Sequence, residues 1–173
     1  MAMLNDFISL IYPRICMACG NTLFQREDCI CTYCLFHLPK TGFHLESENP
    51  VSKIFWGRAN IFSAAAYYYF NKGSRVQSLL HHLKYKGQRE VGTVVGALYG
   101  KELLKSSLFN TVNLILPVPL HPKKKKKRGF NQSDCFAEGL SQGMSIAWTP
   151  DILLRTFASE SQTKKSRFMR RKM

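Results

Sequence analysis

The stretch "TVNLILPVPLHPKKKKKRGFNQ", residues 111–132, carries most of the information about the fold. Its first ten residues form an apolar run that ends at two prolines, which cannot donate to a β-ladder. Such a run predicts a strand that is buried on both faces, as in a parallel sheet. The residues that follow predict a helix over 131–144, capped by Asn131 or Ser133, with Cys135, Phe136 and Leu140 on its apolar face.

Five lysines and Arg128 lie between this strand and this helix. They allow three interpretations: a nuclear-localisation-like patch, a sequence-independent nucleic-acid contact, or an anion-binding loop at the carboxyl end of a strand. Arg128 and Gly129 favour the third, because an arginine beside a helix N-terminus suits a phosphate. We expect most of the lysines to belong to a solvated, mobile loop.

Upstream, helical and extended patterns alternate. A helix over 74–87 is predicted by the apolar stripe of Val76, Leu79, Leu80 and Leu83, with Gly87 closing the turn. A second helix follows from Glu90, and its glycines would permit close packing on a sheet. Residues 60–70 predict a strand or strand pair, residues 40–58 an irregular linker, and residues 4–11 a short helix. The alternation predicts an α/β fold with a parallel-sheet core.

Five of the six cysteines lie between residues 16 and 34. Two Cys-x-x-Cys pairs, Cys16/Cys19 and Cys31/Cys34, supply the four soft ligands of a closed, structural zinc site. Cys29 competes for a ligand position and His37 is a weaker alternative. Without a metal, the clustered cysteines would be reduced structural thiols or a redox pair.

The formal net charge of +14 predicts attraction to polyanions. The segment from His121 to the C-terminus contains thirteen lysines and arginines but only four acidic residues, so much of the excess positive charge lies there. No apolar run approaches the roughly 20 residues of a membrane span, and no signal-peptide pattern is present at the N-terminus, so we expect a cytoplasmic protein without a membrane partner.

The segment "LKYKG", residues 83–87, places Lys84 and Lys86 at a helix end. They could meet an anion such as pyrophosphate, or simply complement the helix dipole. The adjacent His81 and His82 point in different directions on a helix, so we expect one to be exposed and the other partly buried.

Together, the two Cys-x-x-Cys pairs, "LKYKG", "LILPVP", "RGFNQ" and "SQTKKSRFMRR" resemble the ComF family of phosphoribosyltransferase-like proteins associated with competence for DNA uptake. The resemblance implies a structural zinc ion on Cys16, Cys19, Cys31 and Cys34. It places Lys84 and Lys86 near pyrophosphate and makes Arg128 and Gly129, with residues 130–132, the signature after a core strand. Gln162 and Arg167 match the segment that follows.

The resemblance also implies a zinc module over residues 1–45 and a type I phosphoribosyltransferase-like α/β domain over 46–173. Family members continue into an acidic pair and a Thr/Gly-rich loop that binds phosphoribosyl pyrophosphate (PRPP). This sequence contains no such motif, so we expect a C-terminally incomplete domain, inactive as a transferase, with Mg²⁺ bound alongside PRPP only in a complete, active protein. The alternative is a non-catalytic protein that binds single-stranded DNA or a competence helicase through the basic loop and the zinc module.

Overall fold

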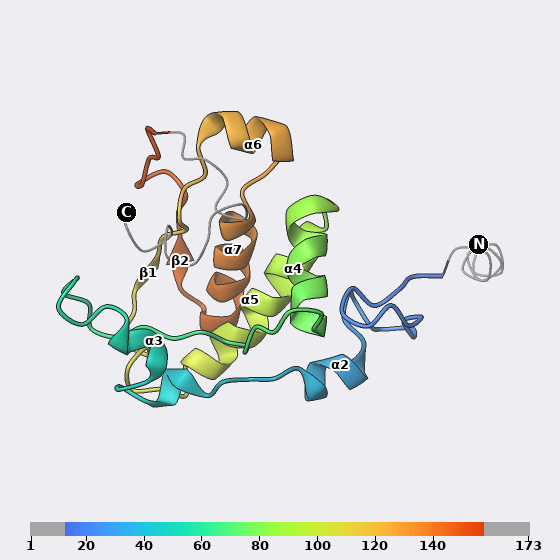
Figure 1. Cartoon of the computed structure of the whole chain (residues 1–173), viewed down its shortest axis with the longest axis horizontal. Helices are drawn as coiled ribbons and strands as arrows, with labels where there is room; N and C mark the ends of the chain where they lie inside the picture. Colours follow the sequence, from blue (N-terminus) through green and yellow to red (C-terminus); the bar gives the residue numbers. More distant parts are fainter. Residues whose placement is uncertain (1–12, 158–173) are drawn as a thin grey trace.

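The computed structural model describes residues 13–157, so the short helix expected over residues 4–11, and the residues Gln162 and Arg167, lie outside the described residues. Within that range the chain forms helices joined by long connections and one small parallel sheet (Figure 1). The helical elements are, in order, α2 (Thr32–His37), η1 (Phe43–Leu45), α3 (Pro50–Lys53), α4 (Arg75–Tyr85), α5 (Arg89–Leu103), α6 (Pro122–Arg128) and α7 (Gln132–Met144). None of the helices in this part of the chain is long and apolar enough to cross a bilayer.

Helix α4 follows the local signals closely. The Ser74 side chain caps it by accepting a hydrogen bond from the backbone N–H of Gln77. Val76, Leu79 and Leu83 are buried along one face, and Gly87 adopts the left-handed φ of 72° that ends the turn. The predicted helix is therefore confirmed, as is the exposure of His81 with His82 half-buried.

Helices α5 and α7 form the most extensive contact between elements, through four glycines. A Cβ on Gly96 would lie 2.4 Å from the carbonyl oxygen of Phe136, and one on Gly139 would lie 2.1 Å from that of Thr93. Gly100 and Gly143 face the partner helix equally closely. The expectation that the α5 glycines pack on a sheet is wrong: they allow two helix backbones to approach each other.

The sheet consists of β1 (Leu114–Ile115) and β2 (Ala147–Trp148), which pair in parallel with Leu114 opposite Ala147. Helix α7 lies between them in sequence and packs against both, as in a strand–helix–strand unit. The expected fully buried strand over 111–120 is wrong. Only two of its residues pair, and Leu114, Leu116 and Val118 are exposed because, among the described residues, β1 has a neighbour on one side only. The structure thus contains a two-stranded parallel sheet, and a full phosphoribosyltransferase-like core is not shown.

Three other segments differ from expectation. The lysine run forms helix α6 instead of a loop: Pro122 occupies its first turn, the His121 ring nitrogen accepts from the N–H of Lys123, and Gly129 ends it at φ 84°. Lysine is a good helix former, and its charges extend into water, where their mutual repulsion is screened. In residues 60–70, Tyr68 makes only an isolated antiparallel bridge to Lys40 in place of a strand, and the linker expected over 40–58 contains η1 and α3.

One hydrophobic cluster joins the cysteine-rich segment to the helices. It contains Cys16, Cys34 and Leu38 together with Leu79 of α4 and Val91 of α5. A second cluster packs Tyr67, Tyr99, Leu103 and Met144 at the other end of α5. The N-terminal segment is therefore packed directly against α4.

Candidate functional site

The four cysteines of the two Cys-x-x-Cys pairs lie together. The Sγ atoms of Cys16, Cys19, Cys31 and Cys34 are all within 4.8 Å of one another, and those of Cys19 and Cys31 are 3.8 Å apart. In a zinc tetrahedron with Zn–S bonds of about 2.3 Å, sulfur atoms lie about 3.8 Å apart. Both the donor set and its spacing therefore fit a tetrahedral, thiolate-preferring metal ion.

Each pair is held by a tight local structure. In the first pair, the backbone N–H of Gly20 donates to the carbonyl of Cys16 at 2.8 Å, with Gly20 at φ 82°, and Ile15 bridges to Thr22. In the second, Cys31 is the N-cap of α2 and Cys34 lies in its first turn, fully buried. Two short turns thus bring four thiols to one point.

Hydrogen bonds to sulfur favour a thiolate at Cys16. Burial raises the pKa of this thiol, but backbone N–H groups of Cys31, Cys19 and Ala18 outweigh burial and lower the pKa to about 7. The N–H of Cys31 lies 3.2 Å from the Cys16 Sγ. Burial raises the pKa of Cys31 and of Cys34, so these thiols need a cation to become thiolates at neutral pH.

Neither alternative ligand joins the group of four. Cys29 is buried, and burial, followed by the charges of Glu90 and Asp28, raises its pKa to about 12. His37 is exposed, stacks on Tyr33 and makes a hydrogen bond between its Nδ1 and the Tyr33 carbonyl. The structure therefore assigns the four candidate ligands to the two Cys-x-x-Cys pairs.

Helix α4 holds the first turn through Met17, the residue after Cys16. The Met17 carbonyl accepts a hydrogen bond from Ser78 Oγ at 2.8 Å and another from His82 Nδ1 at 3.1 Å. Arg75, at the start of α4, lies 5.0 Å from the centre of the Tyr33 ring in α2. Sequence reasoning missed these contacts, since Ser78 and His82 lie more than 60 residues from Met17 and no local pattern links them.

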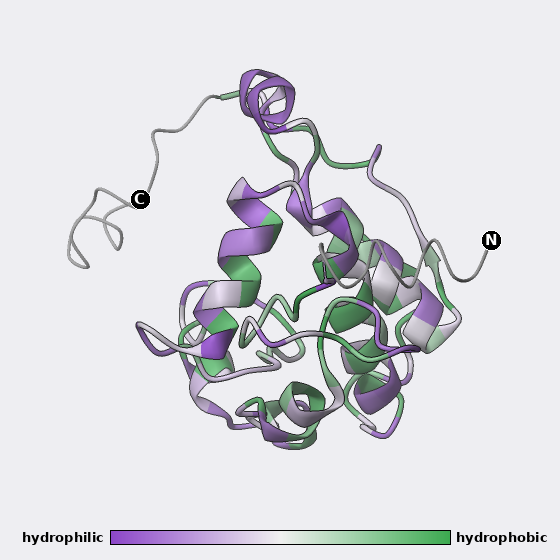
Figure 2. Ribbon diagram, turned by 90° about the vertical axis from the view of Figure 1, so that its right-hand side faces the viewer, coloured by the Kyte–Doolittle hydropathy of each residue, from purple (hydrophilic) through white to green (hydrophobic). Residues whose placement is uncertain are grey.

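After Pro122, every residue of helix α6 is basic, and the helix is the hydrophilic, purple element at the top of Figure 2. Lys123, Lys126 and Lys127 are exposed, while Lys125 lies 3.7 Å from the Asp134 carboxylate. No residue of α6 is buried. The helix is thus a strongly cationic projection from the body of the protein.

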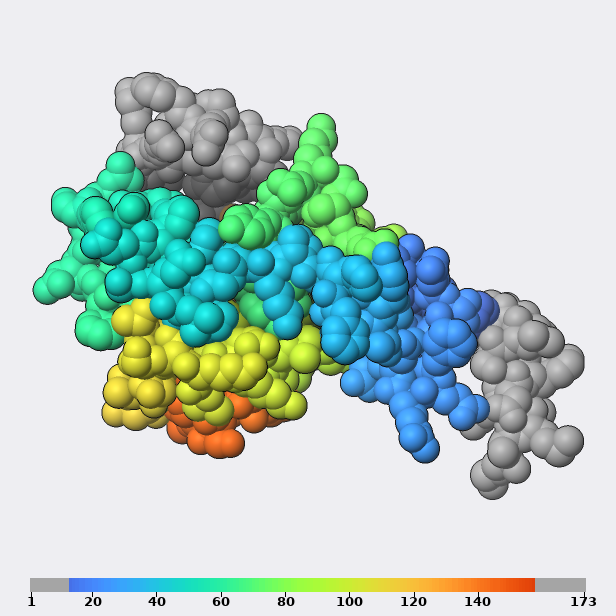
Figure 3. All heavy atoms as spheres, turned by 90° about the horizontal axis from the view of Figure 1, so that it is seen from below, coloured from blue at the N-terminus to red at the C-terminus, as the bar shows by residue number. Residues whose placement is uncertain are grey.

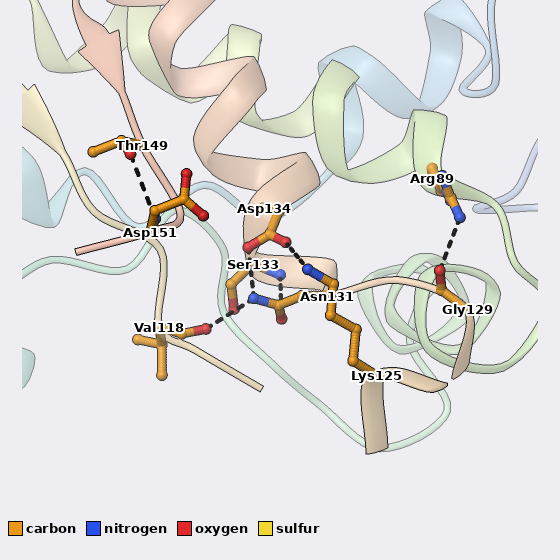
Figure 4. A network of polar contacts seen from close by, with 9 residues as sticks. All are labelled: Arg89, Val118, Lys125, Gly129, Asn131, Ser133, Asp134, Thr149 and Asp151. Carbon is orange, nitrogen blue, oxygen red and sulfur yellow. Dashed lines mark hydrogen bonds and ion pairs between the residues drawn. The ribbon is translucent and has the colours of Figure 1, made fainter. Parts of the chain in front are cut away.

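The N-terminus of α7, where an anion was expected, is occupied by the chain's own side chains (Figure 4). Asn131 caps the helix by accepting from Ser133 N–H, and its Nδ2 donates to the carbonyl of Val118 at 3.1 Å and to Asp134 at 2.6 Å. The Arg128 guanidinium donates to the side chain of Gln132. Asp134 therefore already supplies negative charge at this helix end.

Arg89, the first residue of α5, contacts the "RGFNQ" segment, and the sequence did not single it out. It donates to the Gly129 carbonyl at 3.1 Å (Figure 4) and lies 4.9 Å from the centre of the Phe130 ring. Lys84 lies in the last turn of α4 and Lys86 is its C-cap, positions that suit a cation at a helix C-terminus.

A cavity of about 530 Å³ opens after the carboxyl ends of β1 and β2. Its lining combines acidic and basic groups with prolines and apolar side chains, among them Pro119, Lys125, Asp134 and Asp151. This is the edge at which α/β sheets place their ligands.

The curated proteins to which the chain is similar share one name. The chain is 28% identical over 169 residues to DNA utilization protein YhgH of Escherichia coli O157:H7, covering 95% of this chain and 70% of the relative. It is 27% identical over 159 residues to the protein of that name from Escherichia coli K12, covering 90% of this chain and 66% of the relative. The Salmonella typhimurium LT2 protein is 29% identical over 174 residues, covering 95% of this chain and 70% of the relative.

The chain thus spans about two thirds of the length of these curated relatives. No protein-family model matches the sequence, and no solved structure matches it.

Proposed function

We propose that this chain is a ComF-like DNA-utilization protein that binds single-stranded DNA through helix α6, with a structural zinc ion on Cys16, Cys19, Cys31 and Cys34. The observation that carries the proposal is that a helix with six consecutive basic residues projects into solvent from a protein whose relatives are named for DNA utilization. A contact with a partner helicase remains a prediction.

The exposed lysines of α6 suit a sugar–phosphate backbone. Lys123, Lys126 and Lys127 are exposed and make no ion pair with another residue of the range 13–157, so their charges are available for counterion release by a polyanion. Lys125, which lies beside Asp134, would contribute less. Such binding is sequence-independent and weakens steeply with salt.

The metal ion would stabilise the fold and have no catalytic role. Four cysteine ligands close its coordination sphere, which leaves no position for a catalytic water. The hydrogen bonds from Ser78 and His82 to Met17 would then hold the loaded module on α4. Zinc is the ion that such a thiolate set takes most often in structural sites.

The test is binding of a fluorescein-labelled oligo(dT) as a function of salt. Replacing Lys123, Lys126 and Lys127 by Gln removes up to three phosphate contacts, so we expect weaker binding and a log Kd–log salt slope smaller by about 2. The matched control replaces Lys40, Lys101 and Lys105 by Gln, which removes the same amount of charge outside α6. Equal losses in both variants, or no binding by the unaltered chain, would contradict the proposal.

A phosphoribosyl ligand is the second candidate, favoured by the cavity at the carboxyl ends of β1 and β2. Lys125 and Lys126 line this cavity and would serve its phosphates, and Mg²⁺ would accompany PRPP. Lys84, Lys86, Arg128 and Gly129, the residues predicted to bind phosphate, are not among the lining residues. Calorimetric titration of the chain with PRPP and Mg²⁺ tests this candidate. Saturable heat that is reduced by Lys126→Gln would favour it over simple DNA binding.

A further inference from the structure

The segment of residues 53–62, here called the aromatic loop, presents large apolar side chains to solvent. Phe62 is 84% exposed and Trp56 58% exposed, and Phe55 is also exposed; Lys53 precedes these residues and Arg58 lies between Trp56 and Phe62. The loop reaches the left edge of the molecule in Figures 1 and 3, after α3. A cluster of exposed aromatic side chains of this kind indicates a binding surface.

A buried polar network fixes the base of the loop. Asn49 is fully buried, and its Nδ2 lies 2.8 Å from the Ala64 carbonyl on the far side of the loop. Ser52 Oγ donates to the same carbonyl at 2.9 Å and accepts from the N–H of Ala64 at 3.1 Å. The two ends of the loop are thus tied together, so the outward position of Trp56 and Phe62 is built into the fold.

The charges in the sequence around the loop favour a polyanion. No Asp or Glu lies between Glu48 and Glu90, a stretch that contains seven lysines and arginines. The Lys53 Nζ lies 5.6 Å from the centre of the Trp56 ring, so a cation and an aromatic face stand side by side. Basic groups that track a backbone, combined with aromatic rings on which bases stack, are the elements of single-strand recognition.

We infer that the aromatic loop is a base-stacking site for single-stranded nucleic acid, with Trp56 and Phe62 as the stacking rings and Lys53 and Arg58 as the phosphate contacts. The inference rests on the proposed function and adds to it a second contact, distinct from α6. Helix α6 supplies charge alone, whereas the aromatic loop contacts the bases. The loop would therefore distinguish unpaired from paired strands, because bases in a duplex are already stacked on one another.

Trp56 provides a direct readout, since the chain contains only one other tryptophan, Trp148. In a Trp148→Phe background, oligo(dT) should quench Trp56 fluorescence to saturation, and duplex DNA of equal length should quench it far less. Trp56→Ala with Phe62→Ala should weaken oligo(dT) binding at least five-fold. Phe36→Ala, an equally exposed aromatic change on α2, is the control and should leave Kd unchanged.

The outcomes separate the two ideas. If the α6 variant loses affinity but still shows full quenching at saturating oligo(dT), both contacts are supported. If the Trp148→Phe protein binds oligo(dT) without any change in Trp56 emission, and the loop variant binds it normally, this inference is overturned and the proposed function stands. No DNA binding at all overturns both.

Anionic vesicles test the competing occupant. A blue shift of Trp56 emission with phosphatidylglycerol vesicles, together with no quenching by oligo(dT), would assign the loop to a lipid surface and overturn the inference.

Discussion

Replacement of Asn49 tests the reasoning about the aromatic loop most directly. Its Oδ1 accepts the backbone N–H groups of Val51 at 2.8 Å and Ser52 at 3.0 Å, which caps α3. Its Nδ2 lies within 3.0 Å of the carbonyl oxygens of Phe43, Glu46 and Ala64. One buried side chain therefore satisfies backbone groups from three segments.

The cost of Asn49→Ala follows from these bonds. Loss of the cap costs about 1 kcal/mol. Each buried carbonyl or N–H left without a partner costs about 1–3 kcal/mol, partly offset where the backbone relaxes toward water. We expect a loss of roughly 3 kcal/mol in the free energy of unfolding, which leaves a domain of ordinary stability folded.

Urea unfolding followed by far-UV circular dichroism measures this loss. With a slope of about 2 kcal/mol per molar urea, the midpoint should fall by about 1.5 M. Asn49→Asp separates the effect of the helix cap from that of the buried carbonyl contacts. It keeps the capping oxygen but directs a second oxygen at the carbonyls of Phe43 and Ala64. It should be at least as destabilising as Asn49→Ala, and near-native stability of Asn49→Asp would refute the reasoning.

Three further changes have expected results. Cys16→Ser should remove about one zinc ion per chain and destabilise the N-terminal module, whereas Cys29→Ser should keep the metal, as measured by elemental analysis; the reverse pattern would contradict the ligand assignment. Gly139→Ala should lower the free energy of unfolding in urea by about 1–3 kcal/mol. The reason is that the new Cβ would clash with the Thr93 carbonyl, and this clash costs more than the gain in helix propensity. Unchanged stability would show that α5 and α7 are less tightly packed. Burial lowers the pKa of His44, so the folded state favours its neutral form. The contribution of His44 to the free energy of unfolding is therefore full above pH about 6.5 and is lost as the pH falls below that value. In His44→Phe the acid-side loss of stability should be smaller, and identical pH profiles for both proteins would refute this.

Local signals predicted several parts of the structure. The apolar stripe, Ser74 and Gly87 define α4, because a helix with one buried face needs only a period and its caps. The residues after Gly129 similarly predicted α7 with Asn131 or Ser133 as its cap, and the structure shows that the cap is Asn131. The Cys-x-x-Cys spacing indicated which thiols gather, since each pair closes its own turn.

Other parts were predicted wrongly or only in part. The lysine run could be either loop or helix by composition, and the Pro122 and His121 contacts decided for α6. The glycines of α5 signalled close packing without naming the partner, which the matching glycines of α7 supply.

The sequence alone thus determined the charge of this protein, its candidate metal ligands and its amphipathic helices, because these properties rest on residue type and on spacing within one turn or one helix. Only the tertiary structure showed that Met17 is held by Ser78 and His82, that Asp134 occupies the N-terminus of α7, and that Asn49 closes the aromatic loop. Such contacts join residues through space or through backbone atoms that every residue carries, so they leave no pattern along the chain.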